Sequence, residues 1–321
     1  MEHTSKIYIA GHNGLVGSAL IKKFTQNGYT HLICRNHREL DLSRQQAVET
    51  FFEIEKPEYV VLAAAKVGGI LANNTFPAEF IYDNLTIETN IIHAAWKAKV
   101  KRLIFLGSSC IYPRECPQPM KEAHLLTGPL EATNEPYAIA KIAGIKMCQS
   151  YNRQYGTTYF ALMPTNLYGP NDNFDLETSH VLPALIRKFH EATVASAESV
   201  TVWGTGSPRR EFLYVDDLAD ACLHIINLDD QIYRSLISDK VAPLINVGCG
   251  KDNSIKEMAR MIKKIIGFKG EIVFDPTKPD GTPQKLLDVS LLNKLGWKQT
   301  ISLKKGIADT YQWCLENHIF T

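Results

Sequence analysis

Residues 11–17 read Gly11-His12-Asn13-Gly14-Leu15-Val16-Gly17, and this stretch decides the fold. It follows residues 6–10, which have the pattern of a short buried strand, and it precedes residues 18–26, which have the pattern of a helix. Glycines at this spacing permit a tight turn, close approach of the backbone to a pyrophosphate, and tight packing of the helix on the strand. The N-terminus of the helix attracts the anion. We therefore predict a dinucleotide-binding loop; the alternative is an ordinary glycine-rich turn.

Strands and helices continue to alternate through the first half of the chain. Further strands are predicted at residues 31–34, 59–64 and 102–107, and a long helix opens at Pro77. The unbroken apolar run at residues 59–64 is typical of a parallel strand covered on both faces. The fold class we predict is α/β, a Rossmann-type doubly wound parallel sheet with ligands at the carboxyl ends of its strands.

The alternation loosens beyond about residue 168. We expect residues 1–167 to form an NADP-binding Rossmann domain, to which about 211–248 returns. Residues 168–210 and 249–321 would then form a smaller C-terminal α/β domain for the substrate, a GDP-sugar under the resemblance described below.

Composition excludes several classes of function. The chain has 321 residues, a formal net charge of +1 and no Lys/Arg-rich run, so nucleic acid is not expected as its main ligand. No apolar run reaches the length of a membrane span, and the first residues lack a signal-peptide pattern. The seven cysteines include no CxxC pair, which indicates reduced thiols and no metal site. We therefore expect a cytoplasmic protein without a membrane partner.

The second strand ends on residues that bear on the choice of cofactor. An NAD site usually places Asp or Glu there on the ribose hydroxyl, whereas this chain has Arg35 and Arg38. Arginine suits a 2′-phosphate, so NADP(H) is favoured over NAD. The alternative is that both arginines are solvated surface residues.

Tyr137 and Lys141 are the first candidates for chemistry. They lie four residues apart in a segment that opens a helix at Pro136, so they share one face. An ammonium near a phenol favours the phenolate and lowers its pKa, which would let Tyr137 exchange a proton near neutrality. Most such pairs are a half-buried aromatic beside a solvated lysine, so the pair alone is weak evidence.

Ser108 strengthens the case for a catalytic site. It follows the strand at residues 102–107, where it could hydrogen-bond a substrate carbonyl beside Tyr137. With this Ser–Tyr–Lys set and the glycine loop, the chain resembles the extended short-chain dehydrogenase/reductase family over essentially its whole length.

Within that family, the chain resembles the GDP-L-fucose synthases most. The resemblance lies in residues 63–70 (AAAKVGGI), 107–113 (GSSCIYP), 134–141 (NEPYAIAK) and 164–170 (PTNLYGP). It implies an NADPH-dependent enzyme that takes GDP-4-keto-6-deoxy-D-mannose, inverts carbons 3 and 5 through an enolate, and then reduces the 4-keto group. It also implies a homodimer, with the helices that open at Pro77 and Pro136 as the interface.

Two residues carry the inversion under this resemblance. Cys110 would be the base; an extended segment would put it on the same side as Ser108, and a thiol near cations can serve as a base. His180 would be the matching acid, because its ordinary pKa is close to neutral. Without the resemblance, Cys110 would be expected to be a small buried hydrophobe and His180 a surface or capping residue.

The resemblance also places the remaining binding residues. The expected substrate contacts are Lys188, Trp203, Arg210, Asp280 and Lys285, with Arg210 on the diphosphate and Trp203 on the guanine or sugar. The expected cofactor contacts are Gly11, His12, Asn13, Gly14, Leu15, Val16, Gly17, Arg35, Arg38, Asp41, Leu42, Ala64, Lys66, Leu106, Gly107, Ser108, Lys141, Pro164, Asn166, Leu167 and His180.

Two departures and two rivals stay open. Asn13 and His37 stand where the family can have basic residues, which narrows the margin of NADP over NAD. A UDP-sugar 4-epimerase would share the fold but would have no need of Cys110 with His180. A non-catalytic NADP-binding protein would have no need of Ser108, Tyr137 and Lys141 together, and the fold alone cannot decide between them.

Overall fold

The protein is described by a computed structural model covering residues 1–238, 241–278 and 280–320. Its main sheet has six strands in the order β2-β1-β3-β4-β5-β9, and every neighbouring pair is parallel. The order reverses beside β1, which puts the carboxyl ends of β1 and β3 at the switch point where such sheets bind ligands. The predicted fold class is confirmed. The strands are β1 (Ile7–Ala10), β2 (Leu32–Ile33), β3 (Tyr59–Leu62), β4 (Arg102–Leu106), β5 (Tyr159–Pro164) and β9 (Leu244–Val247).

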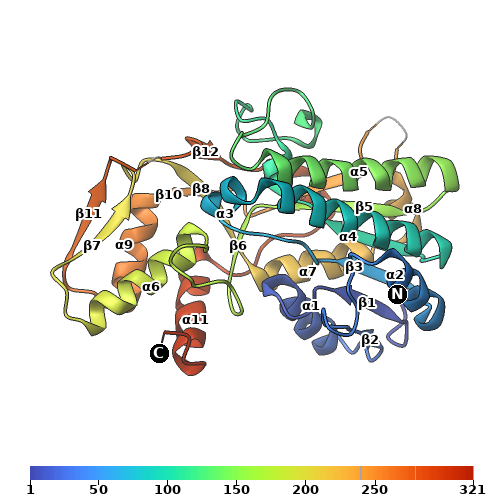
Figure 1. Ribbon diagram of the computed structural model, residues 1–321, viewed down its shortest axis with the longest axis horizontal. Helices are drawn as coiled ribbons and strands as arrows, with labels where there is room; N and C mark the ends of the chain where they lie inside the picture. The colour runs from blue at the N-terminus through green and yellow to red at the C-terminus, as the bar shows by residue number, and fades with distance from the viewer. Residues whose placement is uncertain (239–240, 279, 321) are drawn as a thin grey trace.

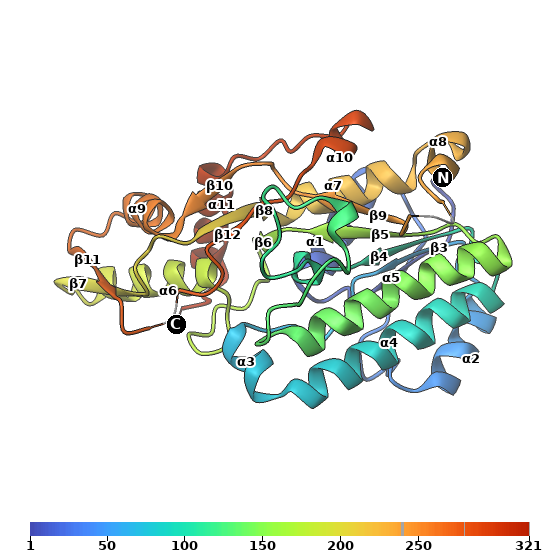
Figure 2. The ribbon, with the colours of Figure 1, turned by 90° about the horizontal axis from the view of Figure 1, so that it is seen from above.

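Helices cover both faces of this sheet (Figures 1 and 2). One apolar core joins the sheet to α2 (Gln45–Glu55), α4 (Pro77–Lys97) and α5 (Glu135–Tyr155). A second core joins the other face to α1 (Leu15–Gln26) and α7 (Val215–Ile226). Helices α4 and α5 run side by side along most of their length, as both views show.

A second, smaller set of sheets and helices, called here the smaller layer system, is built mainly from the later part of the chain. Strand β8 (Arg209–Tyr214) pairs with β6 (Asn166–Tyr168), β10 (Asp252–Ser254) and β12 (Gln284–Lys285), and β7 (Ser199–Trp203) pairs with β11 (Glu271–Asp275). A third apolar core joins β6, β7, β8 and β11 to α6 (Val181–Val194), α9 (Ile255–Ile266) and α11 (Leu303–Glu316).

The segment expected to return to the first domain is divided between the two systems. Helix α7 packs against α1 and strand β9 pairs with β5, so residues 215–247 do contain elements of the main sheet system. Strand β8 instead lies at the centre of the smaller four-stranded sheet. In the sequence, residues 211–248 resemble a further strand and helix of the main sheet, because β8 leads directly into α7.

The remaining elements are short. They are α3 (Ile70–Thr75), α8 (Asp230–Ser235), α10 (Ser290–Lys294) and the 3-10 turns η1 (Ser109–Ile111) and η2 (Glu122–His124). Within the described ranges, none of the helices has both the length and the apolarity required to cross a membrane.

Candidate active site

The glycine loop joins β1 to α1 and has the shape that a pyrophosphate requires. Gly11 has φ +84°, and a Cβ there would come within 2.7 Å of the Ala64 backbone nitrogen. A Cβ at Gly17 would collide with the carbonyl of Gly11. Gly14 is the N-cap of α1 and offers no side chain to the first helical N–H groups. The loop therefore leaves the positive end of α1 open to an anion, and its residues fit a dinucleotide.

The two arginines after β2 have different surroundings. The Arg35 guanidinium lies 2.5 Å from a Glu55 carboxylate oxygen, donates to the Cys34 carbonyl at 2.8 Å and packs over the Phe51 ring. Arg38 is exposed, and its side chain has no ion pair with any residue that the structure describes. Of the two arginines expected to bind the 2′-phosphate, Arg38 is the more available, because Arg35 already has a carboxylate partner.

Asp41 and Leu42 follow in the next turn. The Asp41 carboxylate accepts hydrogen bonds from the Ser43 backbone at 3.0 Å and hydroxyl at 2.7 Å, and these bonds lower the pKa of Asp41. The Leu42 carbonyl accepts from the Asn90 side chain of α4 at 2.9 Å. This turn is therefore fixed beside the carboxyl edge of the sheet.

Other expected cofactor residues lie at the carboxyl ends of β3, β4 and β5. Lys66 follows β3 and forms ion pairs with Glu79 and Asp83. Its backbone exchanges two 3.0 Å hydrogen bonds with the side chain of Asn84, a buried residue of α4 that was not expected at the site. The residues gathered at these strand ends are Ala64, Lys66, Leu106, Gly107, Pro164, Asn166 and Leu167.

Ser108, Cys110 and Tyr137 meet at the end of β4. Ser108 is the N-cap of η1, its hydroxyl accepts from the Cys110 N–H at 3.3 Å, and it lies close enough to the Tyr137 phenol to lower the pKa of that group. Residues 109–111 form a 3-10 turn, so the condition of an extended segment, which would have put Ser108 and Cys110 on one side, is not met. That turn, rather than strand alternation, carries Cys110 to the pocket.

Lys141 lies near Tyr137 on α5, as its spacing predicts, but it has a carboxylate partner that was not expected. Its ammonium lies 2.9 Å from a carboxylate oxygen of Glu88 on α4, and both side chains are almost fully buried, at 2% and 1% exposed. It lies 5.8 Å from the Tyr137 ring centroid and 4.7 Å from that of Phe105. The charge of Lys141 is therefore shared with a carboxylate.

The pKa of Tyr137 accordingly shifts in the direction opposite to the expectation. Burial raises it well above the usual range, the charges of Cys110 and Glu88 raise it further, and the hydrogen bond with Ser108 lowers it. A raised pKa favours the protonated phenol, which suits a proton donor.

Cys110 has two polar neighbours from distant parts of the chain. The Asn134 amide donates to its sulfur at 3.3 Å, and the Lys285 ammonium lies 3.9 Å from the same sulfur. Cys110 and Lys285 line one small pocket with Gln118 and Gln284.

His180 lies at the start of α6, where it is the N-cap. Surrounding protein atoms desolvate its ring although part of the side chain is exposed, and this desolvation lowers its pKa. The positive charge of Lys285 lowers the pKa further. The preceding residues are held by the loop after β3, since the Gly69 N–H donates to the Thr178 carbonyl at 3.1 Å. Lys285 thus acts electrostatically on both Cys110 and His180.

The expected nucleotide-sugar residues lie in the smaller layer system. The Trp203 ring is 59% exposed, and the ammonium of Lys188 lies 5.3 Å from its centroid. Burial lowers the pKa of Lys188. Asp280 accepts from the Thr205 N–H at 2.7 Å and from the Thr205 hydroxyl at 2.8 Å. An exposed aromatic face beside a cation offers a stacking surface for a base.

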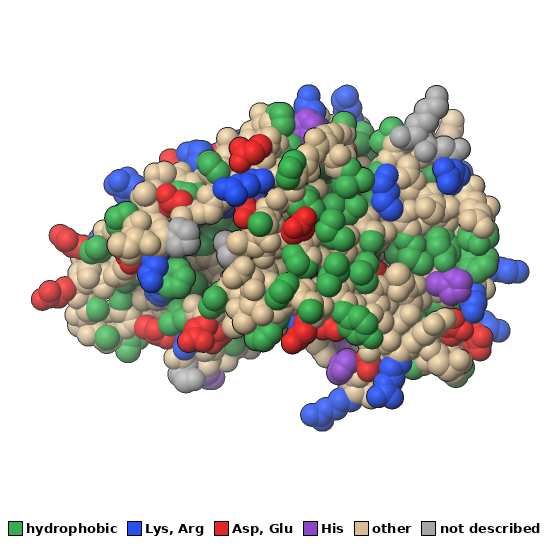
Figure 3. Space-filling model, turned by 45° about the horizontal axis from the view of Figure 1, so that its top comes forward, with side chains coloured by type: hydrophobic (Ala, Val, Ile, Leu, Met, Phe, Trp, Pro, Cys, Tyr) green, Lys and Arg blue, Asp and Glu red, His purple; other side chains and the backbone are tan. Residues whose placement is uncertain are grey.

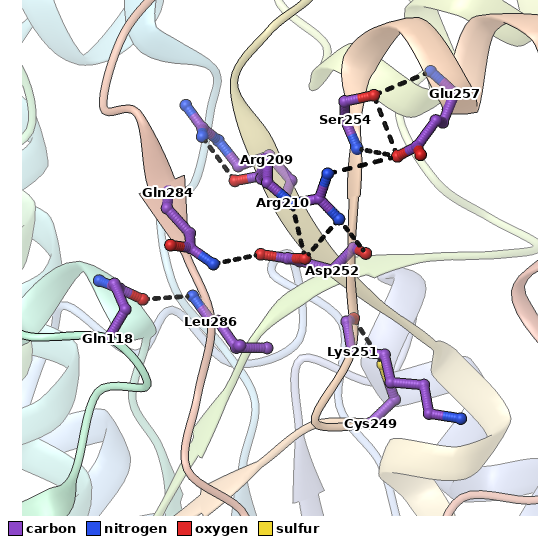
Figure 4. A network of polar contacts seen from close by, with 10 residues as sticks. All are labelled: Gln118, Arg209, Arg210, Cys249, Lys251, Asp252, Ser254, Glu257, Gln284 and Leu286. Carbon is purple, nitrogen blue, oxygen red and sulfur yellow. Dashed lines mark hydrogen bonds and ion pairs between the residues drawn. The ribbon is translucent and has the colours of Figure 1, made fainter.

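Arg210 belongs to a polar network on β8 and its neighbours (Figure 4). It donates to the carbonyl of Arg209 at 2.8 Å, while Arg209 pairs with Asp252 and Glu257. Asp252 also accepts from Gln284 at 2.6 Å. Burial lowers the pKa of Arg210, and Asp280 opposes that shift. Arg209 is thus held by carboxylates, while Arg210 has no ion pair within the described ranges and points away from Asp252.

Sequence reasoning missed three polar residues that shape the site, Asn84, Glu88 and Asn134. Each sits inside or at the start of a helix where its type usually indicates a solvated or capping residue. Sequence offered little signal for Glu88, because the neighbouring residues of α4 include Thr86, Thr89 and Asn90, and a charge in such a stretch is usually solvated.

Comparison with known proteins matches residues 7–235 to the NAD dependent epimerase/dehydratase family. A putative GDP-L-fucose synthase 2 of Arabidopsis thaliana is 58% identical over 317 residues, which cover 99% of this chain and 94% of that protein. The GDP-L-fucose synthase of Escherichia coli K12 is 57% identical over 312 residues, 97% of each chain.

A solved structure with cofactor is also similar. GDP-mannoheptose C4 reductase from Campylobacter jejuni, with NADP bound, superposes with a TM-score of 0.89 at 44% identity, covering 98% of this chain and 99% of the other. The similarity in sequence and in structure extends over both layer systems.

Proposed function

Because this chain belongs to the NAD dependent epimerase/dehydratase family, within the extended short-chain dehydrogenases/reductases, we propose from its relatives and its site that it makes GDP-L-fucose. The substrate is GDP-4-keto-6-deoxy-D-mannose, which is epimerised at carbons 3 and 5 and then reduced at the 4-keto group. The protein is an oxidoreductase with epimerase activity that uses a nicotinamide cofactor. We propose the main sheet system as the cofactor domain and the smaller system as the GDP-sugar domain.

The observation that carries the proposal is the grouping of Cys110, Lys285 and His180 beside Ser108 and Tyr137. Oxidation and reduction at carbon 4 alone, as in a UDP-sugar 4-epimerase, would not need a thiol and an imidazole around one cation. Inversion beside a ketone does need a base on one face and an acid on the other.

The residues divide the two chemistries. Cys110 takes the proton from the carbon beside the ketone, and His180 returns a proton to the opposite face, so the sugar keeps its number of protons. Before the second inversion Cys110 must release its proton and His180 must regain one. Ser108 and Tyr137 hydrogen-bond the carbonyl oxygen and stabilise the negative charge that develops on it in the enolate. In the reduction, Tyr137 gives its proton to oxygen 4. Bound NADPH supplies the hydride for carbon 4.

The direct test is incubation of the protein with GDP-4-keto-6-deoxy-D-mannose and NADPH. We expect loss of the reduced-nicotinamide absorbance and GDP-L-fucose as the sugar nucleotide, identified by NMR. A product that keeps the starting configuration at carbons 3 and 5 would mean a C4 reductase alone. Absence of NADPH consumption would contradict the proposal altogether.

We propose NADP(H) as the preferred cofactor, with Arg38 as the main contact of its 2′-phosphate. Arg38→Ala should lower the preference for NADPH over NADH by roughly tenfold or more, because a hydrogen bond to a charged group contributes about 1.5–3 kcal/mol. The matched control is Arg35→Ala, which removes the arginine already paired with Glu55 and should alter the preference less. Dissociation constants for both cofactors measure this, and an unchanged preference in Arg38→Ala would remove Arg38 from the role.

We propose a homodimer formed through α4 and α5. These helices carry exposed large apolar side chains, including Tyr82 at 67%, Ile139 at 39% and Tyr155 at 45%. Figure 3 shows hydrophobic side chains gathered on the face that includes this half of the molecule. Sedimentation at micromolar concentration should give twice the mass of one chain, and Tyr82→Lys should shift the protein toward the monomer. A monomer for the unaltered protein would contradict the proposal.

A further inference from the structure

Glu88 and Lys141 form an ion pair in the interior between α4 and α5. The Lys141 ammonium lies 2.9 Å from the Glu88 carboxylate and is the only polar partner of that carboxylate among the described residues. Two charges taken out of water are costly to keep, and removal of one partner leaves the other uncompensated. A pair of this kind at the catalytic lysine therefore needs an explanation beyond packing.

The chain leaves space for this carboxylate. A Cβ at Gly144, one turn after Lys141, would lie 2.9 Å from Glu88 Oε2 and 2.5 Å from the Phe105 ring. Glycine in the middle of a helix costs about 1 kcal/mol relative to alanine. The sequence thus carries both the buried carboxylate and the glycine that admits it.

The groups around Glu88 can be enumerated. Lys141, Tyr137 and Cys148 face it from α5, while Phe105 of β4 closes the space with an uncharged ring. The Glu88 charge raises the pKa of Tyr137 and of Cys148, and burial raises the pKa of Glu88 while Lys141 lowers it. Among these groups Glu88 supplies the negative charge that balances Lys141.

We propose that Glu88 is a positioning residue for the reduction: it holds the Lys141 ammonium and balances its charge, so that Tyr137 stays protonated until it gives its proton to the substrate. The inference rests on the proposed function. Lys141 beside an uncharged neighbour would favour the phenolate. With Glu88 the lysine keeps its place without drawing the proton from Tyr137.

The pH dependence follows in sign. Tyr137 must carry its proton to act as a donor, so the rate is lost as pH rises through the pKa of Tyr137. Glu88→Gln removes a negative charge and leaves Lys141 unbalanced, and both changes lower that pKa. The raised pKa of Tyr137 places the alkaline limb of kcat at high pH in the wild type, and Glu88→Gln should move that limb to lower pH.

The experiment compares kcat, KM and NADPH affinity from neutral to alkaline pH in the full-length protein and in Glu88→Gln. We expect the alkaline limb to shift downward while KM for the ketosugar stays near its original value. The matched control is Ile92→Val, which trims the core on the same helix without touching the pair. It should lower stability but leave the limb where it was, because a packing defect changes no charge.

The outcomes separate the two levels of inference. A wild type that does not consume NADPH with the ketosugar refutes the proposed function. A wild type that turns over, with a Glu88→Gln limb in the same place, refutes the role of Glu88. Should Glu88→Gln not fold, Glu88→Asp keeps the charge but withdraws the carboxylate by one methylene; it should lower kcat without a comparable limb shift, and an unchanged kcat would overturn the proposal.

Discussion

Tyr137→Phe should slow carbonyl reduction by about two to four orders of magnitude, the usual range for loss of a general acid. The substitution removes the one hydroxyl that both contacts Ser108 and is positioned to protonate oxygen 4. Since the ring is retained, its edge contact with Phe80 and its place near Lys141 should persist. Single-turnover NADPH oxidation with saturating ketosugar measures the step, and NADPH affinity should stay close to that of the wild type.

The chain offers a matched control in Tyr159. That residue is fully buried on β5, and its hydroxyl has no hydrogen-bond partner among the described residues. Tyr159→Phe therefore removes the same atom from another tyrosine of the same sheet system without touching the pocket, and it should leave turnover unchanged. Wild-type turnover in Tyr137→Phe would remove Tyr137 from its assigned role, whereas equal losses in both variants would indicate general damage.

The sequence was sufficient for the parts of this site that local patterns encode. Glycines between a strand and a helix predict the loop, and a four-residue spacing places Tyr137 and Lys141 on one helical face. These features depend on backbone geometry within a few residues. They survive folding because the main sheet positions β1, β4 and α5 as the alternation of elements predicts.

What local patterns could not predict is the charge around those residues. The Lys141 ammonium was expected to lower the pKa of Tyr137, but a carboxylate 53 positions earlier in the chain pairs with that ammonium. Burial of the phenol raises its pKa instead, and the charges of Cys110 and Glu88 raise it further. Likewise Lys285 reaches the Cys110 sulfur across 175 positions. Such pairings depend on how α4, α5 and β12 pack in three dimensions, and no spacing in one segment contains that information.

The Cys110 turn shows the same limit at short range. Alternation along an extended segment would have placed Ser108 and Cys110 on one side, yet residues 109–111 form a 3-10 turn that Ser108 caps with its own hydroxyl. Serine competes for backbone donors in this way at the ends of strands. The residue types of Ser108 and Cys110 therefore indicated the site, although the backbone between them is not extended.

The second large effect is expected for Cys110→Ala, which should abolish most of the epimerisation while leaving the reduction machinery in place. As a base the sulfur must carry negative charge before it takes a proton, and the Asn134 amide and the Lys285 ammonium lie beside it; alanine has no group for that task. In deuterium oxide without productive reduction, wild-type protein should exchange the hydrogens at carbons 3 and 5 of the ketosugar. Cys110→Ala should lose most of that exchange, as NMR of the recovered substrate would show.

Controls divide the possible causes of such a loss. Cys249→Ala removes a half-buried thiol outside the pocket and should exchange as the wild type does. His180→Ala should retain the first deprotonation but mishandle return of the proton. Since Tyr137 and Lys141 are untouched, Cys110→Ala should bind NADPH normally and reduce unepimerised substrate slowly to a different 6-deoxyhexose. If Cys110→Ala instead exchanges deuterium at the wild-type rate and still yields GDP-L-fucose, Cys110 is not the base, and a histidine or Tyr137 itself becomes the next candidate.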